Sequence, residues 1–156
     1  PRTFSSAASD VYKRQQYVRR RTGVALGAPG SMQAMLYRAL GAGSFAEFWR
    51  YWNPIWGYYL ARNVMRPLRA YCSVPIATVV TFVVSGALHD FAVMLIKWRV
   101  SVFFSCWFSV MGLVVIGTEF AGFQYQHRPW LQRAFINLFF VFLPLLLVES
   151  MLSWIA

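Results

Sequence analysis

The stretch VPIATVVTFVVSGALHDFAVMLIKW, residues 74–98, decides the fold class of this chain. About 20 predominantly apolar residues suffice to cross the hydrocarbon core of a bilayer as a helix. An ionisable side chain, His89, lies inside this stretch, and such a group usually marks a functional site that faces protein or water. At helical spacing, Thr78, Thr81, Ser85 and His89 share one face. This polar stripe predicts either a functional site or a helix–helix interface stabilised by small and polar residues.

The composition supports a membrane protein. Hydrophobic residues make up 58% of the 156 residues and charged residues only 13%, whereas soluble domains average about 45–50% and about 25%. The net charge of +10 would also suit a nucleic-acid-binding protein. The basic residues, however, lie at the ends of apolar runs, where they meet lipid headgroups or set topology. We therefore expect membrane lipids as partners and no nucleic acid.

Two further apolar stretches follow the first, at 101–122 and 131–154, and the turns between them are short. Pro144 is expected to kink the last one. The predicted fold is all-α, a polytopic transmembrane helical bundle with about three spans and an interfacial amphipathic helix. Three spans enclose little cavity, so we expect the chain to be a fragment of a larger bundle.

An aromatic and basic segment at 45–71 precedes the first span. Ser44, followed three residues later by Glu47, forms a capping-box pattern that predicts the start of a helix. The tryptophan, tyrosine and arginine residues of this segment are typical of a helix lying in the membrane interface. Pro54 and Pro67 are expected to break or kink this helix.

The basic residues at the span ends predict the orientation in the membrane. Those on the side of the aromatic segment are Arg62, Arg66, Arg69, Arg128 and Arg133; those on the opposite side are Lys97 and Arg99. By the positive-inside rule, five against two favours a cytoplasmic aromatic segment. We expect an integral, multi-pass protein of the bacterial inner membrane or the endoplasmic reticulum.

Residues 1–21 differ from the rest of the chain, because they are polar and end in three consecutive arginines. We interpret them as a non-native segment, similar to translated adapter sequence, or as a disordered basic tail that binds anionic lipid. Residues 22–156 are then the C-terminal part of a membrane domain.

Two motifs, taken in order, point to a family. Trp52-Asn53 ends the run FWRYWN, and Ser85-Gly86-Ala87-Leu88-His89 lies in the run FVVSGALHD. The pair resembles the membrane-bound O-acyltransferase family, in which a Trp-Asn or Trp-His motif in a cytoplasmic-side loop precedes a Ser-Gly-x-x-His motif in a membrane helix. The run FVVSG is most similar to the wax synthase-like branch. The resemblance is specific for about 45–98, and only general hydropathy extends it further.

The resemblance implies an enzyme that moves an acyl group from acyl-CoA, or a similar thioester, to a hydroxyl-bearing acceptor such as a lipid, an alcohol or a polysaccharide. His89 would be the general base, since an imidazole with a pKa of about 6.5 suits that role at neutral pH. Asn53 would orient His89 or the acceptor, or donate a hydrogen bond to the oxyanion; its other interpretation is a helix cap beside Pro54. No metal or cofactor is expected besides acyl-CoA as co-substrate.

Six side chains are assigned to substrate binding: Trp49, Trp52, Ser85, Arg62, Arg66 and Arg69. The arginines share a helical face and would hold the phosphates of acyl-CoA or anchor lipid headgroups. The tryptophans would wall the acyl channel or belong to an aromatic belt. Ser85 would hydrogen-bond His89 one turn away or bond back to its own helix.

Two alternatives to an acyltransferase stay open. The first is a transporter or proton-relay fragment, in which several buried acids are usual but only Asp90 accompanies His89 here. The second is a catalytically inactive membrane scaffold whose polar stripe only packs helices. Asp90 itself is expected to contact Lys97 or a span missing from this chain.

Overall fold

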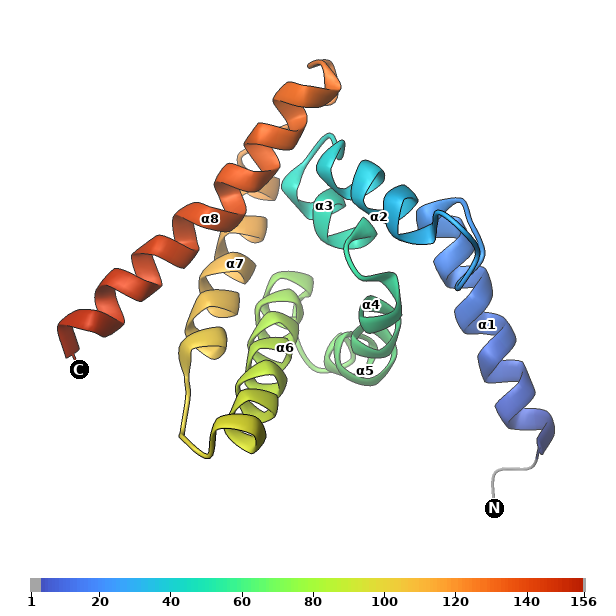
Figure 1. Cartoon of the computed structure of the whole chain (residues 1–156), viewed down its shortest axis with the longest axis horizontal. Coiled ribbons are helices and arrows are strands. Elements are labelled where there is room, and N and C mark those ends of the chain that lie inside the picture. Colours follow the sequence, from blue (N-terminus) through green and yellow to red (C-terminus); the bar gives the residue numbers. More distant parts are fainter. Residues whose placement is uncertain (1–3, 156) are drawn as a thin grey trace.

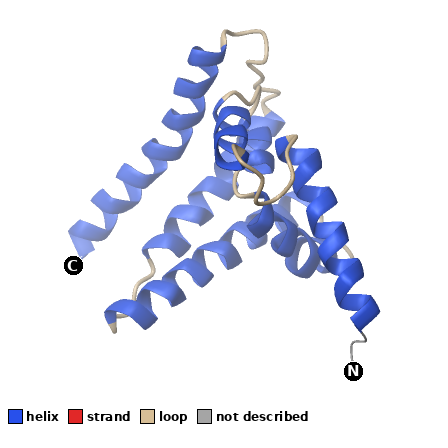
Figure 2. Ribbon diagram, turned by 45° about the vertical axis from the view of Figure 1, so that its right-hand side comes forward, coloured by secondary structure: helices blue, strands red, loops and turns tan. Residues whose placement is uncertain are grey.

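The structure, a computed structural model, describes residues 4–155, and every regular element in that range is a helix (Figure 2). The predicted all-α fold is therefore confirmed. The elements in chain order are α1 (Phe4–Thr22), α2 (Ser31–Leu40), α3 (Phe45–Tyr51), α4 (Pro54–Leu60), the π-helical segment η1 (Ala61–Met65), α5 (Arg66–Leu68), α6 (Val74–Lys97), α7 (Phe103–Phe120) and α8 (Trp130–Ile155).

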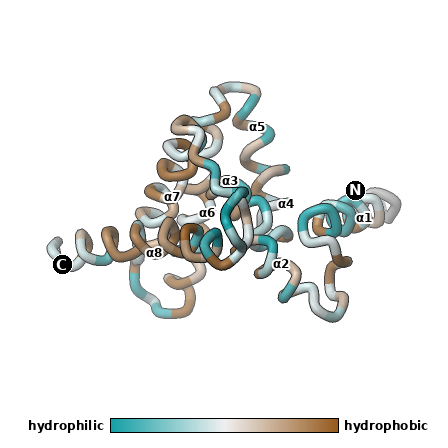
Figure 3. The backbone as a smooth tube through the Cα atoms, turned by 90° about the horizontal axis from the view of Figure 1, so that it is seen from above, coloured by the Kyte–Doolittle hydropathy of each residue, from teal (hydrophilic) through white to brown (hydrophobic). Residues whose placement is uncertain are grey.

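Three of these helices, α6, α7 and α8, are long and apolar enough to cross a membrane. They match the three predicted spans, and α8 continues through Pro144 as one helix. Only 17% of each apolar window is buried within the chain. Figure 3 shows hydrophobic residues along α7 and α8. The C-terminal half of α8 extends away from the other helices (Figures 1 and 2).

Helices α6 and α7 form an antiparallel hairpin and lie side by side (Figure 1). Gly86 sets their separation at one crossing point, because a Cβ atom there would lie 2.4 Å from the carbonyl oxygen of Phe104. At a second point, Gly112 of α7 packs against Phe82 of α6. Small residues at such contacts let membrane helices approach closely.

Replacing Gly86 with alanine should destabilise the hairpin by about 1–3 kcal/mol, since the added methyl group meets backbone rather than a movable side chain. Gly117→Ala is the matched control, because its Cβ would meet nothing within 4 Å. Unfolding of both variants by SDS in mixed micelles measures the difference. Equal stability of the two variants would contradict the close contact.

The start of α7 is capped by a side chain from α6. Asp90, 5% exposed, accepts hydrogen bonds from the backbone N–H groups of Phe104 (3.0 Å) and Ser105 (2.7 Å) and from the Ser101 hydroxyl (2.9 Å). These are first-turn donors that a helix leaves unsatisfied, and a carboxylate near a helix N-terminus is also favoured by the helix dipole. Asp90 thus contacts the next span, and its carboxylate does not pair with Lys97.

The segment predicted as one interfacial helix is divided into pieces. Ser44 caps α3 as predicted, with its Oγ accepting from the Glu47 N–H at 3.2 Å. The chain then breaks before Pro54, as expected for a proline that starts a new helix. Pro67 does not break it: the π-helical segment η1 continues into α5, and the proline lies in the first turn of α5, where a missing N–H is tolerated.

A buried network joins α8 to the turn between α2 and α3. The Asn137 side chain, fully buried, donates to the carbonyls of Leu40 (2.9 Å) and Ala42 (3.1 Å) and accepts from the Tyr125 hydroxyl (2.5 Å). Burial raises the pKa of the Tyr125 phenol above its usual range, and the charge of Glu47 adds to this effect. Beside the network, the aromatic side chains of α3 pack against α7 in the main hydrophobic core.

Residues 4–22 form helix α1, so the structure differs from the expected disordered tail. Alanine, glutamine, lysine and arginine favour a helix here, and one face of α1 packs against α4. Arg14 donates to the Tyr59 hydroxyl at 2.8 Å, and the Tyr17 and Tyr58 rings meet edge to face at 5.5 Å. The similarity of this segment to adapter sequence concerns its origin and stays a prediction.

Candidate functional site

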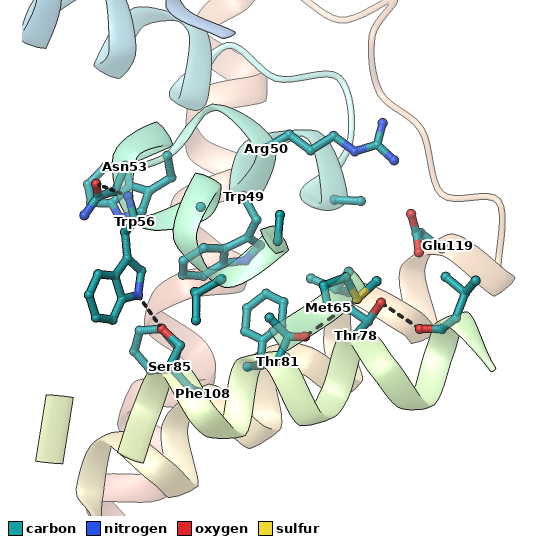
Figure 4. Close-up of a pocket in the computed structure, with 18 of the residues that line it drawn as sticks. Trp49, Arg50, Asn53, Trp56, Met65, Thr78, Thr81, Ser85, Phe108 and Glu119 are labelled. Carbon is teal, nitrogen blue, oxygen red and sulfur yellow. Dashed lines mark hydrogen bonds between the residues drawn. The ribbon is translucent and has the colours of Figure 1, made fainter. Parts of the chain in front are cut away.

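A groove of about 420 Å³ runs along the polar stripe of α6. Figure 4 shows Ser85 of α6 opposite Trp56, and Thr78 and Thr81 beside Met65. The volume lies within the range of about 300–1,000 Å³ that is common for ligand sites. Val74 at one end and His89 at the other are 15 residues apart in α6, which is about 22 Å at the helical rise. The stripe therefore faces a groove as well as neighbouring helices.

A hydrogen bond to a main-chain carbonyl fixes the imidazole of His89. Its Nδ1 lies 2.7 Å from the Ser85 carbonyl oxygen, which can only accept, so Nδ1 carries the proton and donates it. This leaves Nε2 as the nitrogen with a free lone pair, and no residue within 4–155 hydrogen-bonds to it. A ring fixed in this tautomer is suited to accept a proton at Nε2.

Aromatic rings surround His89 and fix the plane of the imidazole. Phe108 of α7 stacks on it at 5.1 Å between centroids, Phe104 lies at 5.6 Å, and Trp56 of α4 meets it edge on at 5.6 Å. The imidazole is half-buried among them. Such packing restricts rotation of the ring about its own side-chain bonds, so the hydrogen bond to Ser85 is kept.

Trp56 connects the two motifs, and it was not among the assigned site residues. Its indole N–H donates to the Ser85 hydroxyl at 2.9 Å, across the groove from α4 to α6 (Figure 4). Its backbone N–H donates to Oδ1 of Asn53 at 3.3 Å. The Ser85 side chain therefore binds Trp56, while His89 uses the Ser85 carbonyl. The position of Trp56, three residues after Asn53 in the first turn of a helix, was the available signal.

Asn53 is the N-cap of α4, as its alternative interpretation expected. It has a left-handed backbone with φ of 40°, a conformation that asparagine tolerates better than most residues. Its Oδ1 is used by the cap, whereas its Nδ2 makes no hydrogen bond to residues 4–155. Asn53 and His89 line the same groove. The amide N–H₂ is thus free to donate to a ligand.

One of the three assigned arginines lines the groove. Arg69 lines it together with Arg50 and Glu119. Figure 4 shows Arg50 and Glu119 at the end of the groove near Thr78, here called the mouth. Arg62 instead pairs with Asp10 of α1 at 2.9 Å, and that hydrogen bond, with a second that Arg62 donates to the Tyr58 hydroxyl, raises the pKa of Arg62.

Arg66 is exposed and also lies outside the groove. The shared arginine face assumed regular α-helical spacing, but η1 has i→i+5 hydrogen bonds and shifts the register. Arg50, which sequence reasoning did not assign, takes the place of these two side chains at the mouth.

Both assigned tryptophans line the groove. Trp49 packs against Phe82 of α6 and Phe108 of α7, and its buried Nε1 has no hydrogen-bond partner within the described chain. Trp52 is 38% exposed and stacks on Phe48 at 5.6 Å. The two side chains give the groove an apolar wall opposite the hydroxyls of α6.

Those hydroxyls are largely satisfied within their own helix. Thr78 donates to the Val74 carbonyl and Thr81 to the Ala77 carbonyl.

Across residues 4–155, no three His, Cys, Asp or Glu side chains gather closely enough to hold a metal ion.

Comparison with known proteins identified no relative. The sequence matches no family model, and neither a curated protein nor a solved structure matches it. The resemblance to membrane-bound O-acyltransferases therefore depends on the two sequence motifs alone.

Proposed function

We propose that this chain carries the acceptor-activating part of a membrane O-acyltransferase, which transfers an acyl group from a thioester such as acyl-CoA to a hydroxyl group. The observation that carries the proposal is the Nε2 of His89, left free by the Nδ1–Ser85 hydrogen bond, in a groove that also holds Asn53. A base and an amide donor along one groove suit attack of a hydroxyl on a carbonyl.

In the proposed reaction, Nε2 of His89 takes the proton of the acceptor hydroxyl as its oxygen attacks the thioester carbonyl. The carbonyl oxygen becomes an oxyanion, to which Nδ2 of Asn53 donates a hydrogen bond. The carbon–sulfur bond then breaks, and the imidazolium returns the proton to the leaving thiolate. The products are an ester and a free thiol, and no covalent enzyme intermediate is needed because both substrates occupy one groove.

The mouth of the groove suits the charged end of the donor. Arg50 and Arg69 would hold phosphate groups by charge-assisted hydrogen bonds. The span of about 22 Å between Val74 and His89 leaves room for an extended chain to reach from the mouth to the base. The basic residues at this end favour a cytoplasmic mouth by the positive-inside rule, and the donor would then enter from the cytoplasm.

The test is ester formation by membranes containing the full-length protein, supplied with labelled acyl-CoA and a panel of fatty alcohols, sterols and diacylglycerol. We expect an ester product that requires both the thioester and one class of acceptor. Free fatty acid in place of the thioester is the control and should give no product. Absence of ester with every donor and acceptor, in membranes where the protein is folded, would contradict the proposal.

A further inference from the structure

A second cavity, of about 350 Å³, lies where the start of α8 meets the turn between α2 and α3. Figure 1 shows these elements together at one end of the hairpin, away from the middle of the spans. The side chains that line it are largely polar or aromatic: Tyr37, Arg38, Glu47, Tyr51, Gln126, Trp130 and Arg133. None of them belongs to the groove of the proposed reaction, so this cavity is a separate site.

One face of α8 makes hydrogen bonds to the end of α2 and to the turn between α2 and α3. Trp130 donates its indole N–H to the Tyr37 carbonyl at 3.0 Å. Seven residues later, Asn137 donates to the carbonyls of Leu40 and Ala42. Residues seven apart lie on the same side of a helix, two turns apart. This side of α8 thus makes hydrogen bonds to the end of α2 and to the turn that follows it.

Arg133 lies between these two side chains on the same face of α8, and its hydrogen-bonding capacity is unused. Its side chain makes no hydrogen bond or ion pair with any residue from 4 to 155, and its Nε is buried without a partner. A guanidinium carries five donors, and burial of an unpaired donor is costly. An anion in the cavity would accept hydrogen bonds from the N–H₂ groups of this guanidinium.

The cavity is shaped by two glycines. A Cβ at Gly41 would lie 2.4 Å from Nε1 of Trp130, and a Cβ at Gly43 would lie 2.6 Å from Cβ of Gln126. The Gly43 carbonyl also accepts from the Tyr125 N–H at 2.8 Å. The wall opposite α8 is therefore the backbone of these two glycines, packed closely against Trp130 and Gln126. This close packing makes the site pre-organised.

The charges around the cavity favour a single anion. Arg38 and Arg133 contribute two positive charges, and Glu47 contributes one negative charge. One Glu47 oxygen already accepts from the Gly43 N–H at 3.1 Å. Arg38 donates to the Arg21 carbonyl at 3.2 Å through one nitrogen, which leaves its other N–H groups for a ligand.

We propose that this cavity binds a phosphate group through Arg133 and Arg38. Guanidinium groups match the geometry of phosphate oxygens, and basic pockets beside the ends of membrane helices bind anionic headgroups. The stacked rings of Tyr37 and Trp130, 5.2 Å apart, flank the site at the level where aromatic side chains meet headgroups. The phosphate would come from an anionic phospholipid or from a soluble phosphate ester. This inference does not depend on the proposed acyl transfer.

Native mass spectrometry of the full-length protein in detergent tests the site, with phosphatidic acid as the lipid probe and glycerol 3-phosphate as the soluble probe. We expect Arg133→Gln to weaken binding of the preferred probe by about tenfold to a hundredfold, as for loss of a charged hydrogen-bond donor. Arg128→Gln is the matched control, because Arg128 is exposed on the same side but does not line the cavity. It should bind like the original protein.

The two probes distinguish the source: binding of phosphatidic acid alone indicates a lipid headgroup, and binding of both indicates a site for the phosphate group itself. If Arg133→Gln fails to fold, Arg38→Gln carries the same expectation. Equal binding by Arg133→Gln and the original protein, or an equal loss in Arg128→Gln, would overturn the proposal. The first result would mean that Arg133 is not a ligand, and the second that only diffuse charge attracts the probe.

Discussion

Replacing His89 with glutamine should reduce acyl transfer by about 10²–10⁴-fold, the usual contribution of a general base. Glutamine has a side chain of similar size and still reaches the Ser85 carbonyl through its amide, but it cannot accept a proton at neutral pH. The stacking of Phe104 and Phe108 against position 89 would be partly kept. The loss should therefore fall on the rate of transfer and not on the amount of folded protein.

The matched control is His127→Gln, because His127 is exposed in the loop before α8 and lies outside the groove. Ester formation per folded protein, measured for both variants, gives the comparison. Transfer by His89→Gln at the original rate would remove His89 as the base. It would leave the polar stripe as a helix-packing feature, which is the scaffold alternative.

Replacing Asp90 with alanine should destabilise the protein by about 2–6 kcal/mol. The change removes the acceptor for the backbone N–H groups of Phe104 and Ser105, and each buried unsatisfied group costs about 1–3 kcal/mol. The Ser101 hydroxyl loses its partner as well. Asp90→Asn keeps one carbonyl oxygen and should lose about half as much stability.

SDS titration in mixed micelles measures these stabilities, with Glu149→Ala as the control for loss of an exposed carboxylate from a membrane helix. We expect that control to stay within about 0.5 kcal/mol of the original protein. Comparable stability of Asp90→Ala would mean that the start of α7 finds other acceptors. The variant should also lower acyl transfer, because Phe104, in the first turn of α7, lies beside the imidazole.

Local patterns in the sequence predicted most of the fold. Hydropathy and length determine which segments can cross a membrane, so the bounds of α6 and α8 agreed with expectation to within one or two residues. The stripe from Thr78 to His89 was predicted because helical periodicity alone puts those residues on one face. The cap of Ser44 on Glu47 was predicted for the same reason, since it depends on residues three apart.

Features that depend on contacts between distant segments were not predictable. The capping of α7 by Asp90 requires knowing how α6 and α7 pair, and the packing of α1 depends on the side chains of α4. The sequence did not indicate the wider turn of η1 or the pairing of Arg62 with Asp10, because the first is not visible in local composition and the second depends on where α1 packs. Trp56 was missed because its importance lies in reaching Ser85 from another helix.

The imidazole of His89 is aimed by a peptide carbonyl and not by a neighbouring side chain. No substitution at position 85 can remove that oxygen, since every amino acid supplies it. The orientation of the ring therefore depends on the rigidity of a long helix. Mutation of the serine would loosen the opposite wall of the groove, but it would leave the direction of the ring unchanged. Re-aiming it would require bending α6 itself.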